Sequence, residues 1–75
     1  MNVFRKQKTP LELRHELLQE EIKKTKLALD SAYSNFENVI DPDLIDCYIY
    51  EVNAFQRRYV FLLKQAEKLK AMMQG

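Results

Sequence analysis

Residues 41–52 read DPDLIDCYIYEV, and this stretch decides the fold. Asp41 followed by Pro42 is typical of a helix start, because an N-cap aspartate accepts a backbone N–H hydrogen bond and proline fits the first helical position. Asp43 and Asp46 follow in the first turns, where the helix dipole favours negative charge. We therefore expect the three aspartates to start a helix. A divalent-cation site on them is the alternative, although they lack the glycine turn and distal glutamate of a calcium loop.

A second helix start precedes this one, in the stretch TPLE. Thr9 is a suitable N-cap, Pro10 fits the first helical position, and Glu12 completes a capping box. No glycine or proline interrupts the two segments that follow the prolines, so each is expected to form one continuous helix. The predicted organisation is a basic flexible tail at residues 1–9 and a helical hairpin at residues 10–75, with helices at about 10–38 and 42–73 and a turn at 39–41.

Apolar side chains recur at alternating steps of three and four residues in both segments, which is the heptad spacing of helices packed along one seam. Two long helices with a short link fold back on each other. In an antiparallel register centred near Pro42, Thr25 faces Tyr59 in the core. The sequence therefore predicts an all-α fold, an antiparallel two-helix hairpin that resembles a coiled coil. The expected seam positions are Leu11, His15, Leu18, Ile22, Thr25, Leu29, Ala32, Phe36 and Val39 on the first helix, and Ile45, Tyr48, Val52, Phe55, Tyr59, Leu62, Ala66, Leu69 and Met73 on the second.

The second helix carries more apolar surface than one partner helix can cover. Cys47, Tyr50, Ala54 and Phe61 lie off the seam and share a second face by helical spacing. A large exposed apolar face usually marks an interface. We predict that this face joins two hairpins into a four-helix bundle or docks on a partner protein. The alternative is a set of scattered surface aromatics, which are common on soluble proteins.

A chain of 75 residues buries only a small core, and such chains usually need disulfides, a metal, self-association or very regular helix packing. Cys47 is the only cysteine, which excludes an internal disulfide and fits a reducing compartment. The start, MNVFRKQKTP, lacks the apolar stretch of a signal peptide, and no apolar run approaches the roughly 20 residues that span a bilayer. We expect a cytoplasmic homodimer.

Signals of catalysis are weak. No glycine-rich loop is present to bind phosphate. The only histidine, His15, falls on the seam, where a packing role is the simpler interpretation. Ser31 and Ser34 have no base nearby, and Cys47 stands among acidic residues that disfavour a reactive thiolate. We predict no catalytic residue, no cofactor and no metal ligand.

Acidic and basic residues gather at opposite ends of the predicted hairpin. Residues 27–56 hold six acids and no base, whereas the remaining residues hold twelve bases and five acids, so the tip carries −6 and the open end +7. Asp30 and Glu37 lie in the C-terminal half of the first helix, where the dipole opposes them. A basic protein partner at the tip would explain that placement. The three basic residues of the tail, Arg5, Lys6 and Lys8, are too few for stable anchoring, so nucleic acid and membrane are disfavoured as partners.

The stretch NFENVIDPDLIDCYIYEVNAFQRRYVFLL, residues 35–63, resembles the YaaL-like family of small bacterial proteins of unknown function. The likeness rests on DPDLID and on the YEVN, RY and LL that follow it. This resemblance implies a cytoplasmic protein of Gram-positive bacteria, often encoded beside recombination and sporulation genes. It implies no known activity and no catalytic residues.

The hairpin also resembles the small sporulation-regulator phosphatases, which remove the phosphoryl group from a response-regulator aspartate. Their second helix carries Ser-Gln-Glu-Leu-Asp where this chain reads IYEVN, residues 49–53. Glu51 and the aliphatic Val52 are kept, whereas Ile49 replaces the serine and Asn53 replaces the acid. What the resemblance implies is therefore docking on a response regulator without the motif carboxylate.

The function that the sequence favours is a non-enzymatic protein–protein interaction or regulatory module. One alternative is a regulator that docks on a response regulator. A second is weak binding of nucleic acid or a membrane surface through the basic open end, which residues 1–8 would provide.

Overall fold

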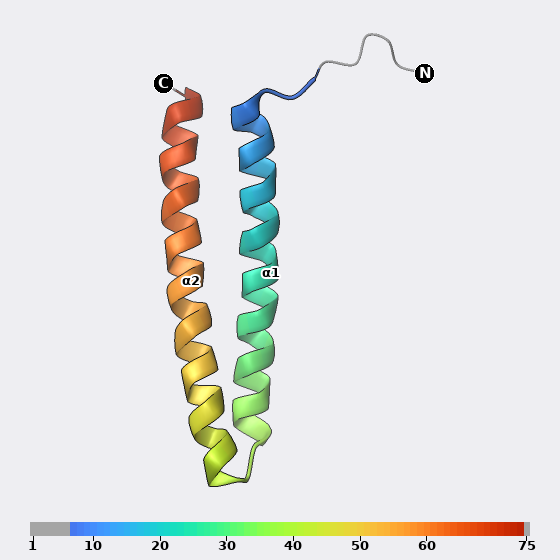
Figure 1. The fold of residues 1–75 in the computed structure, drawn as a ribbon, viewed down its shortest axis with the longest axis vertical. Helices are drawn as coiled ribbons and strands as arrows, with labels where there is room; N and C mark the ends of the chain where they lie inside the picture. The colour runs from blue at the N-terminus through green and yellow to red at the C-terminus, as the bar shows by residue number, and fades with distance from the viewer. Residues whose placement is uncertain (1–6, 75) are drawn as a thin grey trace, which may run out of the picture.

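The computed structural model describes residues 7–74, which form two helices and no strand. Helix α1 spans Pro10–Asn38 and helix α2 spans Pro42–Gln74. The helices run antiparallel side by side, and the start of α1 lies at the same end of the rod as the end of α2 (Figure 1). The predicted all-α, two-helix fold is confirmed. Most of the predicted basic tail, residues 1–6, lies outside the described residues.

Helix α1 begins with the predicted capping box. The Glu12 amide donates to Thr9 Oγ1 at 3.1 Å, and the Thr9 amide donates to Glu12 Oε1 at 3.0 Å. These two bonds satisfy backbone donors that the first turn of a helix leaves without partners. The helix ends where Val39 turns to an extended conformation, with φ −81° and ψ 142°.

Asp41 caps the start of helix α2, as the sequence predicted. The Asp43 amide donates to Asp41 Oδ1 at 2.9 Å, and the amides of Leu44 and Ile45 donate to the Asp41 carbonyl at 3.1 and 3.0 Å. The N-cap role of Asp41 is therefore confirmed. Within residues 7–74, no group of three or more His, Cys, Asp or Glu side chains is arranged to hold a metal ion.

Burial follows the predicted seam. Sixteen of its eighteen positions are buried or half-buried, and the others, Phe36 and Met73, are exposed near the two ends of the rod. These two predicted core positions are wrong: Phe36 and Met73 line open hollows beside the seam, because two helices cannot enclose such large side chains from every side. Thr25 is buried as expected, whereas Tyr59 is only half-buried, because a tyrosine is too long to be enclosed between two helices.

Two cross-helix contacts define the register. Arg58 Nη2 lies 3.0 Å from Glu21 Oε2 on one flank of the seam. On the other flank, Gln56 Nε2 donates to the Tyr33 hydroxyl. The position midway in sequence between Glu21 and Arg58 lies before Pro42, and the position midway between Tyr33 and Gln56 lies equally far after it. Both contacts therefore agree with an antiparallel register centred on that proline.

The hairpin is a single layer of two helices. Its shortest dimension is 12 Å between Cα extremes, so both broad faces of the layer are open to solvent. Only one seam is enclosed, and its best-buried residues are Thr25, Leu29, Ala32, Leu62 and Leu69. Across residues 7–74, neither helix combines the length and apolarity that crossing a membrane requires.

The contribution of the seam to stability can be tested by comparing substitutions at two adjacent leucines. Leu62 is 8% exposed on the seam and Leu63 is 38% exposed beside it. Leu62→Ala should lower the free energy of unfolding by about 2–4 kcal/mol, because it removes packed methyl groups and leaves a cavity. Leu63→Ala, the matched control, should cost less than about 1 kcal/mol. Urea unfolding followed by circular dichroism measures both, and equal losses would contradict this seam.

The start of α2 makes a second prediction. Asp41→Ala should cost about 1 kcal/mol of unfolding free energy, because it removes the side-chain acceptor of the Asp43 amide. Asp41→Asn keeps an acceptor oxygen at that position and should retain most of the stability. A loss with asparagine as large as that with alanine would show that charge, rather than capping, is the contribution of Asp41.

Candidate interaction surfaces

The predicted interface residues lie on the side of α2 that points away from the seam, here called the outer face: Cys47, Tyr50, Ala54 and Phe61. All four are exposed, with Tyr50 at 76% and Phe61 at 59%. Cys47, Ala54 and Phe61 follow one another at intervals of seven residues, so they form one stripe along the helix. The hairpin leaves this stripe uncovered.

A second apolar surface lies on one flank of the seam near the tip and was not grouped by the sequence analysis. Tyr33 and Phe36 of α1 and Ile49, Val52 and Asn53 of α2 line a hollow of about 100 Å³, here called the flank groove. Ile49 directly follows a seam residue, Tyr48, and Tyr33 directly follows Ala32. That position beside the seam is the sequence signal that could have revealed the groove.

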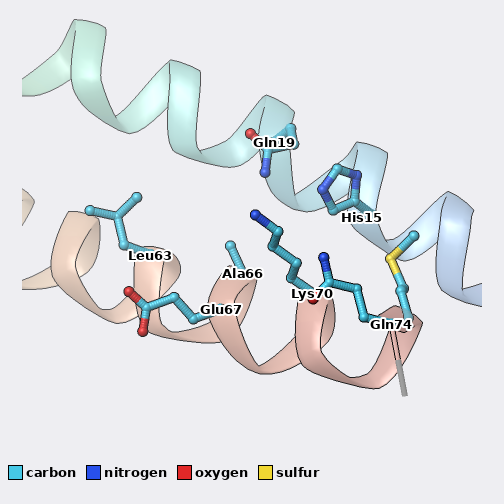
Figure 2. Close-up of a pocket in the computed structure, with 8 residues that line it drawn as sticks. His15, Gln19, Leu63, Ala66, Glu67, Lys70 and Gln74 are labelled. Carbon is cyan, nitrogen blue, oxygen red and sulfur yellow. The ribbon is translucent and has the colours of Figure 1, made fainter.

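A third hollow, of about 590 Å³, lies at the open end of the hairpin and includes the predicted seam histidine. Figure 2 shows Lys70 extending from α2 toward Gln19 and His15 of α1, while Glu67 points away from α1. No hydrogen bond within residues 7–74 joins His15 to a nucleophile or a carboxylate. The hollow at the open end is therefore a wide, open surface with the imidazole of His15 and the ammonium of Lys70 at its edge.

The exposed ion pairs of the hairpin lie mainly in its basic half, at the open end. At the open end, Lys8 pairs with Glu16, and Glu21 pairs with Arg58 and more distantly with Lys24. These contacts are exposed and each contributes little to stability. They give two acids of that half of the rod, Glu16 and Glu21, a basic partner.

At the acidic tip, only Asp30 has a basic partner among the described residues. Lys26 Nζ lies 2.8 Å from Asp30 Oδ1, and this hydrogen bond, helped by the charge of the carboxylate, raises the pKa of Lys26. The pair explains the placement of Asp30 without an external partner, which the sequence analysis had invoked. Five acids of the tip form no ion pair within residues 7–74: Glu37, Asp41, Asp43, Asp46 and Glu51.

The family described as "Protein of unknown function (DUF2508)" matches residues 1–73. The chain belongs to this family. The family description assigns no activity, and the match extends over both helices and all of the surfaces described above. No curated protein and no solved structure matches the chain.

Proposed function

We propose that this member of the DUF2508 family is a non-enzymatic interaction module that pairs with a second copy through the outer face of α2. The observation that supports it is an apolar stripe left open by a hairpin with a single seam. Two such stripes placed together bury each other and give a four-helix bundle. The YaaL-like resemblance further suggests a bacterial protein that works in the cytoplasm.

The exposed area of the chain is large enough for such an interface. Its accessible surface is 6473 Å², whereas a compact monomer of 9.0 kDa exposes about 4,900 Å². The excess of about 1,600 Å² is more than the roughly 800 Å² that each partner buries in a standard interface. The elongated shape of the rod contributes to the excess, and side-by-side packing of two rods would remove part of it.

Charge favours the antiparallel arrangement of the two rods. Parallel packing would place one acidic tip beside another, whereas antiparallel packing places each acidic tip beside a basic open end. Surface charges of this kind decide orientation more than affinity. The two-fold axis then falls near Tyr59 and Thr25, at the middle of the rod.

The outer face is tested by a substitution and a control of matched exposure. Phe61→Glu places a charge in the proposed interface and should weaken dimerisation at least tenfold. Leu27→Glu is the control, because Leu27 is 61% exposed, against 59% for Phe61, but lies on α1. Analytical ultracentrifugation at low salt measures both. A monomeric wild type, or equal effects of the two substitutions, would contradict the proposed face.

The orientation is tested by the exposed thiol of Cys47. Cys47 is 12 residues from Tyr59, or roughly 18 Å along the helix, so the two thiols of an antiparallel dimer stand roughly 36 Å apart. A disulfide requires Cα atoms within about 7 Å. Mild oxidation should therefore give no covalent dimer while light scattering still reports the non-covalent one.

A positive control uses the same chemistry near the axis. In a Cys47→Ser background, Arg57→Cys moves the thiol to within two residues of the level of Tyr59, where two copies can approach each other. This variant should crosslink efficiently under the conditions that leave the wild type uncrosslinked. Efficient crosslinking through Cys47 would instead establish a parallel dimer.

A further inference from the structure

We propose that the flank groove binds a basic amphipathic helix from a partner protein. This inference rests on the proposed function, because it assigns a partner to the surface that remains free when the outer face holds a second copy. Successive helical residues are separated by about 100° around the axis, so Ile49 and Cys47 point about 160° apart. A copy seated on the outer face therefore leaves the flank groove open.

The flank groove is a small hollow that can receive an apolar side chain. Its walls come from both helices, with Tyr33 and Phe36 on one side and Ile49 and Val52 on the other. The hydroxyl of Tyr33 accepts a hydrogen bond from Gln56, which holds one wall in place across the seam. A hollow of about 100 Å³ admits an apolar side chain and excludes a bulky folded surface. The groove is therefore preorganised for a protruding side chain.

Further apolar residues lie on the same flank of α2, beyond the polar Asn53 and Gln56. Val60 and Leu63 follow Ile49 at helical spacing, and both are exposed. From Ile49 to Leu63 this line extends roughly 21 Å, which matches a partner helix of about 14 residues. A helix laid along the line would present a residue to it every three or four positions.

Acids at the edge of the groove specify the charge of that helix. Glu37 lies four residues after Tyr33, and Asp46 lies three residues before Ile49, so each neighbours a groove residue on its own helix. Neither acid forms an ion pair within residues 7–74. Lysine or arginine beside the apolar stripe of a partner would pair with them, whereas an acidic helix would be repelled.

The binding test uses a fluorescein-labelled, helix-forming peptide of leucine and lysine about 18 residues long, with its leucines along one face. Two control peptides separate the contributions. One has the same composition with the leucines dispersed around the helix, and the other has glutamate in place of lysine. We expect the amphipathic basic peptide to bind, as measured by fluorescence anisotropy, and both controls to bind at least tenfold more weakly. Equal binding of either control would overturn the proposal.

Variants locate the binding site. Ile49→Ser and the double substitution Glu37→Gln/Asp46→Asn should each weaken binding of the peptide at least tenfold. Leu44→Ser is the matched control, because Leu44 is 46% exposed, against 41% for Ile49, but borders a different hollow at the tip. It should leave affinity unchanged. Circular dichroism checks that all variants keep their helicity, which is expected because the replaced side chains are exposed.

The same experiment keeps the two proposals apart. Phe61→Glu should lose dimerisation and still bind the peptide with the affinity of the wild type. If the wild type is monomeric but binding still depends on Ile49, the dimer proposal alone is wrong. If the dimer forms but peptide binding depends on Phe61 rather than Ile49, the groove proposal alone is wrong.

Discussion

The structure depends on one geometric constraint: two helices in a single layer share one seam and can enclose nothing else. Thr25, Leu29 and Ala32 of α1 and Leu62 and Leu69 of α2 are buried along that line, and every other apolar side chain within residues 7–74 stays at least partly exposed. The stability of a domain depends on the apolar area that it removes from water, which is limited here by the number of helices rather than by the number of apolar residues. The excess apolar surface of α2 therefore remains available for binding.

Most of the fold could be predicted from the sequence because its signals are local. Thr9, Asp41 and their following prolines determine where the helices start, and a spacing of three and four residues determines which face of each helix is buried. The flank groove could not be predicted in the same way, because it depends on which residues beside the seam come together across it. Tyr33 and Ile49 belong to different helices and form a common surface only once the register is established. The Lys26–Asp30 pair, by contrast, has i, i+4 spacing and could have been recognised from the sequence.

The separation of charge along the rod is hard to explain by stability. Asp46 and Glu37 are exposed and unpaired within the described residues, and the acids of the tip repel one another across the turn between the helices. Mixing lysines among them would relieve this repulsion at no cost in packing, since none of these positions is on the seam. The helix dipole favours Asp46 near the start of α2 but opposes Glu37 near the end of α1, so stability accounts for only part of this charge pattern. The basic partner proposed above would account for the rest.

Two apolar surfaces on opposite sides of α2 also have different electrostatic surroundings. The outer face runs from the acidic tip to the basic end, so it is complementary to itself when reversed, which is what a two-fold interface requires. The flank groove lies entirely in the acidic half, near Glu37 and Asp46, so a second copy of the same groove would meet it with like charge. Repulsion of that kind would disfavour self-association through the groove and favour the proposed basic partner. In the proposed arrangement, α2 would carry one surface suited to its own copy and another suited to a different protein, and the charge gradient along the rod would keep the two from competing.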